Sequence, residues 1–109
     1  YKRLFGEEVD QDKNGCLQDV HWYAGLFGYF PTYSLGALTA AQLAAQLRID
    51  VKNLDQQIEI GDFTELLKWL KLNVHSKASL YSTDEILQQV TNSKLNVKYF
   101  ESYIKKRYL

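Results

Sequence analysis

An acid and an imidazole stand two residues apart in an aromatic segment near the start of the chain. Asp19 and His21 lie within residues 15–36, GCLQDVHWYAGLFGYFPTYSLG, which hold many of the chain's aromatic rings. A carboxylate that fixes the tautomer of an imidazole, among rings that exclude water, suits the stabilisation of an oxyanion. The same residues also suit a structural role, in which Asp19 caps a turn and His21 is satisfied by backbone groups.

Other combinations of catalytic side chains have less support. His21 and His75 are the only histidines, Cys16 is the only cysteine, and the sequence has no HExxH motif. A catalytic zinc site usually needs about three protein ligands, so we expect no metal site within this chain. Ser34 or Cys16 could be combined with His21 and Asp19 as a nucleophile, but no nucleophile elbow accompanies them.

The remaining reactive or cationic residues favour structural roles. His75 falls at the end of a predicted helix, where its charged form would be favoured by the helix dipole. Lys105, Lys106 and Arg107 are typical of a solvated helix end. Trp69 is expected to pack in the core.

Composition narrows the classes of partner. The chain has 109 residues, enough for a single domain over residues 1–109. Its 13 Lys and Arg balance its 13 Asp and Glu, so no overall field would recruit nucleic acid or an anionic membrane. No apolar run approaches the roughly 18 residues of a membrane span.

The lone cysteine is compatible with a reducing cytosol, and the predicted location is cytoplasmic. The sequence has no methionine and opens on YKRLFG, which resembles a last helical turn closed by Gly6 and suggests part of a longer protein.

Periodicity predicts an all-α fold, with no alternating pattern that would indicate a sheet. The expected helices cover about residues 32–47, 51–60, 63–75, 83–92 and the stretch after Asn96. Asp62 and Asn96 are candidate N-caps, and STDE at residues 82–85 has the pattern of a capping box. Apolar residues expected on the buried sides of two of these helices are Phe63, Leu66, Leu67, Leu70 and Val74, and Tyr99, Phe100, Tyr103, Ile104 and Tyr108.

The aromatic segment also resembles a known motif. GCLQDVHW, residues 15–22, resembles the GxxQDxHW signature of zinc metallocarboxypeptidases of the carboxypeptidase Taq type. GYFPTYSLG resembles the stretch that follows that signature, and GDFTELLKWLKLNVH, YSTDEIL and YFESYIKKRYL resemble the family's C-terminal helices. The resemblance covers nearly the whole chain from about Leu4. It breaks near Ala78, where the family usually carries glycine, so a different local turn is expected there.

The resemblance implies a function for a longer parent. Members of this family are several times longer, mostly helical, often homodimeric, and release C-terminal amino acids from peptides. They hold zinc with the histidines of HExxH and a downstream glutamate, and the glutamate within HExxH is the general base. Since those residues and the family's arginine motifs are missing here, the chain resembles the C-terminal portion. It would form one wall of the active-site cleft, be inactive alone, and have the rest of the parent polypeptide and a peptide substrate as partners.

The resemblance also implies roles for residues of the motif. Gly15 would permit a tight loop, and Trp22 would anchor the loop in the core. Gln18 and Asp19 would fix the backbone of the loop and orient its neighbours, and with Tyr29 they are the predicted substrate-binding residues. His21 would face the cleft beside the substrate carbonyl.

A tyrosine hydroxyl would complete this wall of the cleft. Tyr33 is the first candidate to donate to the tetrahedral intermediate, and Tyr29 is the second. The alternative function is a non-enzymatic helical interaction module that uses the aromatic segment as a docking surface, since exposed apolar area would look the same in the sequence.

Overall fold

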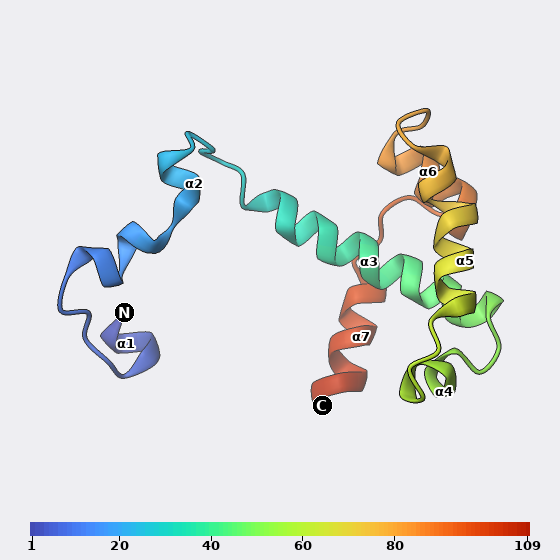
Figure 1. The fold of residues 1–109 in the computed structure, drawn as a ribbon, viewed down its shortest axis with the longest axis horizontal. Helices are drawn as coiled ribbons and strands as arrows, with labels where there is room; N and C mark the ends of the chain where they lie inside the picture. The colour runs from blue at the N-terminus through green and yellow to red at the C-terminus, as the bar shows by residue number, and fades with distance from the viewer. The chain divides into compact units, whose positions relative to one another are not determined.

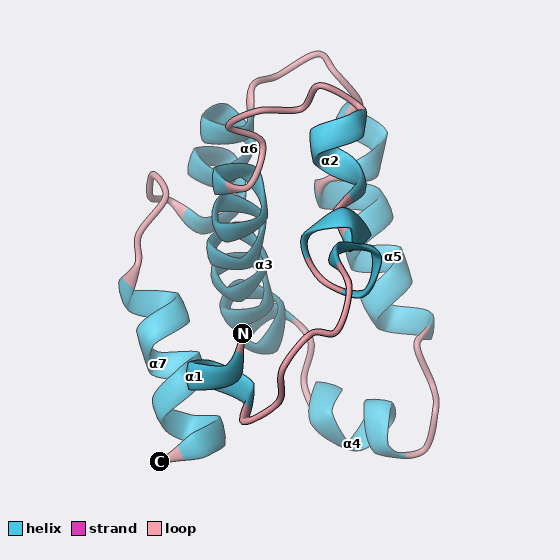
Figure 2. Ribbon diagram, turned by 90° about the vertical axis from the view of Figure 1, so that its left-hand side faces the viewer, coloured by secondary structure: helices cyan, strands magenta, loops and turns pink.

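The computed structural model describes residues 1–109, and all of its regular structure is helical (Figure 2). This confirms the predicted all-α fold. No helix is both long and apolar enough to cross a membrane.

The chain divides into two compact units, Tyr1–Tyr33 and Ser34–Leu109, which are described separately. The α-helices, labelled in Figure 1, are α1 Lys2–Phe5, α2 Val20–Tyr23, α3 Pro31–Asp50, α4 Leu54–Glu59, α5 Thr64–Asn73, α6 Thr83–Thr91 and α7 Lys98–Tyr108. Short 3₁₀ turns cover Asp12–Asn14, Cys16–Gln18 and His75–Lys77.

The first unit is a series of short turns. Helix α1 ends at Gly6, which has φ 77° in the left-handed region and closes the helix as predicted. Gly15 follows the first 3₁₀ turn, and a Cβ there would approach Cγ1 of Val9 to 3.0 Å. Glycine therefore lets the chain pass Val9 closely.

Helix boundaries in the second unit follow local signals. Helix α3 begins at Pro31, a residue whose fixed φ suits the first helical turn. It extends to Asp50, three residues beyond the predicted end. Helix α4 begins at Leu54, later than predicted, because Asn53 adopts φ 59° and interrupts the right-handed helix.

Of the predicted caps, the capping box forms at the N-cap of its helix, whereas Asp62 and Asn96 each lie one residue before the N-cap, contrary to the prediction. Oδ1 of Asp62 accepts the backbone amide two residues ahead at 3.0 Å, and Oδ1 of Asn96 does the same at 3.0 Å. At the start of α6, Ser82 Oγ accepts the amide of Glu85 at 3.3 Å, while the Glu85 carboxylate accepts the amide of Ser82 at 2.8 Å. The capping box is therefore confirmed.

A small apolar core holds the second unit together. Leu47, Leu54 and Trp69 are its buried centre, and Trp69 is 7% exposed, as expected for a core residue. Its indole Nε1 donates to Oδ2 of Asp50 at 2.8 Å, which satisfies the polar edge of the ring. The partly buried residues around this centre are Leu43, Val51, Leu66, Leu70, Val74 and Val90. Burial of one such side chain contributes about 1.5–3 kcal/mol.

Two predicted apolar stripes are only partly buried. On α5, Leu66, Leu70 and Val74 pack on the core, but Phe63 is 47% and Leu67 58% exposed. The prediction that all of them face the core is wrong for the last two, because the core touches a narrower arc of the helix.

The stripe on α7 behaves in the same way. Tyr99, Phe100 and Ile104 are half-buried, whereas Tyr103 is 44% and Tyr108 66% exposed. Both tyrosines therefore depart from the predicted buried side.

A buried glutamine joins segments that are distant in the sequence. Gln42 on α3 is fully buried, and its Nε2 donates to Oγ1 of Thr91 at 2.7 Å and Oγ of Ser93 at 3.0 Å. Its Oε1 accepts the amide of Asn96 at 2.9 Å. One side chain thus satisfies polar groups of the connection between α6 and α7.

Candidate functional site

Asp19 organises the aromatic segment. Its Oδ1 accepts the backbone amide of His21 at 2.9 Å and lies 2.8 Å from Nδ1 of the same residue. Its Oδ2 accepts Nε1 of Trp22 at 2.7 Å. Because Asp19 is the N-cap of α2, one carboxylate both starts the helix and orients two of its side chains.

These hydrogen bonds favour the charged carboxylate. Partial burial raises the pKa of the Asp19 carboxyl, but the backbone and side-chain hydrogen bonds from His21, with that from Trp22, lower the pKa by more. The pKa therefore lies below its ordinary value, and Asp19 is an acceptor at neutral pH.

Tyr33 lies on the other side of the imidazole. Its hydroxyl oxygen is 2.8 Å from Nε2 of His21. Because the Asp19 carboxylate can only accept, Nδ1 of His21 donates to it, and in the neutral ring Nε2 accepts the Tyr33 hydroxyl proton. In the protonated ring Nε2–H donates instead, and the Tyr33 proton is then free for another acceptor.

Aromatic rings surround the imidazole. The ring of Phe30 meets His21 edge-on with centroids 5.1 Å apart, Tyr33 meets it edge-on at 5.7 Å, and Tyr29 is tilted at 5.5 Å. The side chain of His21 retains 22% exposure. A cavity of about 130 Å³ lies beside it, lined by His21, Trp22 and residues 26–30. The imidazole is therefore confined by rings while one side opens onto a small cavity.

The structure brings most of the predicted site residues together. Asp19, His21 and Tyr33 form one hydrogen-bonded chain, and Tyr29 packs against His21 by its ring. Gln18 is not in that chain, because its Nε2 donates to the carbonyl of Lys13 and so ties the preceding loop.

Trp22 is not in a core within residues 1–109. It is 59% exposed, and its ring edge meets Phe27 at a centroid distance of 5.4 Å. The orientation of the indole is therefore set by its hydrogen bond to Asp19 and not by burial among apolar side chains.

The side chains present do not form a metal site. No group of three or more His, Cys, Asp or Glu side chains converges where it could hold an ion. Both ring nitrogens of His21 are engaged, and His75 is exposed on a 3₁₀ turn.

Sequence reasoning gave no specific role to Phe30, although its ring centroid lies nearest to the imidazole among the three neighbouring rings. Its place in the aromatic segment was a signal, but no spacing rule separates it from the neighbouring rings. The buried Gln42 was also missed, because its partners lie 49 to 54 residues away.

Comparison with known proteins places this geometry in context. The model of the family described as carboxypeptidase Taq (M32) metallopeptidase matches residues 1–108. The chain is 37% identical to carboxypeptidase 1 of Bacillus subtilis and 32% identical to thermostable carboxypeptidase 1 of Pyrococcus furiosus, over 108 residues in each case. These matches cover 99% of this chain and 22% of each relative.

A solved structure has the same helical arrangement. Metallocarboxypeptidase 1 of Trypanosoma cruzi superimposes with a TM-score of 0.82 at 42% identity, covering 98% of this chain and 23% of that one. The chain therefore spans about a fifth of the length of the relatives that it matches.

Proposed function

The chain belongs to the carboxypeptidase Taq (M32) family of metallopeptidases, and from this premise we propose that it forms one wall of the active-site cleft of a longer carboxypeptidase. The substrate would be a peptide, from which the parent releases the C-terminal residue. Zinc or another divalent metal would be held by residues outside this chain, since the side chains present do not form a metal site. The parent is proposed to be a homodimer.

The observation that carries the proposal is the hydrogen-bonded chain of Asp19, His21 and Tyr33. In this chain the Tyr33 hydroxyl is the group with a proton to offer to an oxyanion, once Nε2 of His21 donates to the hydroxyl oxygen. Asp19 accepts from Nδ1 of His21 and so holds the ring with Nε2 toward the Tyr33 hydroxyl. Tyr33 is thus the proposed catalytic donor, His21 polarises it, and Asp19 is a positioning residue.

Tyr29 and the rings around His21 have a supporting role in this proposal. Tyr29 makes no hydrogen bond to the imidazole but packs against His21 in a tilted arrangement and against Tyr33 edge-on, with centroids 5.5 Å apart in each pair. Such rings exclude water, which strengthens the remaining hydrogen bonds. Tyr29 and the cavity beside it would therefore contact the substrate rather than donate to the reacting carbonyl.

Substitution in the full-length parent tests the assignment. We expect His21→Ala to lower kcat by about 100- to 1,000-fold, since it leaves the Tyr33 donor unpolarised and loss of one oxyanion donor costs about 2.7–4 kcal/mol. Tyr33→Phe should have a similar effect, and the double variant should be little worse than either, because the two residues act as one unit.

The control is His75→Ala, which removes the only other histidine from an exposed turn and should leave kcat unchanged. Metal content measured by atomic absorption should stay at the wild-type level in every variant. Loss of metal from the His21 variant, or wild-type kcat in it, would contradict the proposed role.

The alternative, a docking module without catalysis, draws on the exposed aromatic rings of the first unit, such as Phe27 at 74% exposure. The upstream reading frame separates the two. An HExxH motif within the preceding few hundred codons supports the peptidase, and its absence there supports the module.

A further inference from the structure

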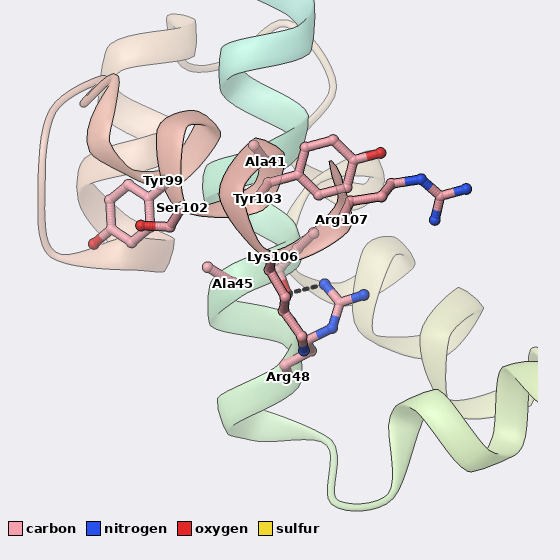
Figure 3. A pocket seen from close by; sticks show the side chains of 9 residues that line it. Ala41, Ala45, Arg48, Tyr99, Ser102, Tyr103, Lys106 and Arg107 are labelled. Carbon is pink, nitrogen blue, oxygen red and sulfur yellow. Dashed lines mark hydrogen bonds between the residues drawn. The ribbon is translucent and has the colours of Figure 1, made fainter. Parts of the chain in front are cut away.

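The second unit has a groove that is lined by no residue of the aromatic segment. It runs between α3 and α7 and encloses about 340 Å³. Its floor is formed by Ala41, Ala44 and Ala45, three small residues on one face of α3. Figure 3 shows this face beside the side chains that α7 contributes to the groove. We refer to it as the α3–α7 groove.

Cations from both helices line this groove. Arg48 comes from α3, and Lys106 and Arg107 come from α7. Arg48 is paired with Asp55 at 3.0 Å, but neither Lys106 nor Arg107 makes an ion pair. The neighbouring Lys105 is different, because it is paired with Glu101 at 2.6 Å and does not line the groove.

The walls of the groove are amphipathic. Tyr99 and Tyr103 contribute ring faces, and Tyr103 is 44% exposed. A surface with a floor of alanines allows the backbone of another helix to approach closely, because helices pack by placing ridges in such grooves. Unpaired cations at its rim would favour carboxylates on that helix.

We propose that the α3–α7 groove holds an acidic helical segment of the longer polypeptide, from the part outside residues 1–109. The matched relatives are several times longer than this chain, and their shared structure is helical, so additional helices are available to cover exposed faces. The inference rests on the proposed longer parent and is independent of any role for His21.

Zero-length cross-linking with a carbodiimide tests the proposal in the full-length parent. Lys106 should link to an Asp or Glu of the same polypeptide outside residues 1–109, identified by mass spectrometry of the digest. Mixing isotopically light and heavy protein separates links within a chain from links between chains. A link between chains, or a Lys106 that reacts with acetylating reagent as fast as it does in the unfolded protein, would overturn the proposal.

Charge reversal gives a second readout. Lys106→Glu should abolish the cross-link and lower the Tm of the parent more than the matched variant Lys105→Glu does. Both changes place a carboxylate in the last turn of α7, so both carry the same unfavourable helix-dipole effect. Lys105→Glu also loses the pair with Glu101, so a larger Tm loss in Lys106→Glu cannot be explained by interactions within α7. Replacing the cross-linked carboxylate by lysine should restore the Tm of the Lys106→Glu variant, and equal Tm losses in the two variants without such rescue would overturn the proposal.

Failure of the catalytic assignment can be distinguished from failure of the groove proposal. Wild-type kcat in His21→Ala would remove the catalytic assignment and leave the Lys106 cross-link unaffected. A parent without any segment beyond residues 1–109 would be revealed by its intact mass and would remove both.

Discussion

The two compact units are stabilised in different ways. In residues 34–109, apolar side chains such as Leu87, 1% exposed, are removed from water, and buried Gln42 closes a polar network among them. In residues 1–33 no side chain is fully buried, and the geometry depends on hydrogen bonds and ring contacts around Asp19 and His21. The unit that holds Asp19, His21 and Tyr33 therefore has less buried core of its own than residues 34–109 have.

The largest effect should come from the core of the second unit. Leu87→Ala should lower the free energy of unfolding by about 2–5 kcal/mol, because it removes buried methyl groups and leaves a cavity. The matched change in the first unit, Phe27→Ala, removes a larger side chain that is 74% exposed and should cost much less. Urea unfolding of residues 1–109 measures both. A larger loss for Phe27→Ala would reverse the comparison.

The second-largest effect on the free energy of unfolding should come from the hydrogen bonds of the buried Gln42 side chain. Gln42→Leu should cost about 1–3 kcal/mol, since it keeps the volume but leaves the amide of Asn96 without its acceptor. The control Gln88→Leu, at an exposed position of α6, should be nearly neutral. Hydrogen exchange should show the amide of Asn96 exchanging faster in the Gln42 variant. Unchanged exchange there would mean that the network does not restrain the connection.

A smaller effect, of opposite sign, should occur at Ala78. Its φ of 45° and ψ of −127° lie in a region that suits glycine, so the break in the family resemblance coincides with a strained alanine. Ala78→Gly should therefore raise the free energy of unfolding by about 1 kcal/mol, the strain relief exceeding the entropy cost of glycine. The control is Ala40→Gly at an exposed position of α3, which should lower the free energy of unfolding by about 1 kcal/mol. If both changes destabilise, Ala78 is not strained.

The smallest effect should come from protonation of Asp19. Because its folded pKa is below the ordinary 3.8, its hydrogen bonds stabilise the first unit above that pH, and this contribution is lost as the pH falls through the folded pKa. The indole N–H resonance of Trp22 should report this step in an NMR titration. In the Asp19→Asn variant the step should disappear. A midpoint above 3.8 would contradict the hydrogen bonds assigned to this carboxylate.

The sequence alone determined features that depend on near neighbours. The cap at Gly6, the start of α3 near Pro31 and the capping box of Ser82 and Glu85 each involve a few consecutive residues, so their chemistry is visible in the sequence. The motif of residues 15–22 was sufficient to indicate the family.

Features that depend on contacts between distant residues could not be predicted from local patterns. The tertiary structure brought Tyr33 rather than Tyr29 within hydrogen-bond distance of Nε2 of His21, although both tyrosines lie on the same short segment. It left Phe63 exposed on an apolar stripe, because helical periodicity shows which residues share a face but not how wide an arc another element covers. It also joined Gln42 to residues some fifty positions away, which no local pattern encodes.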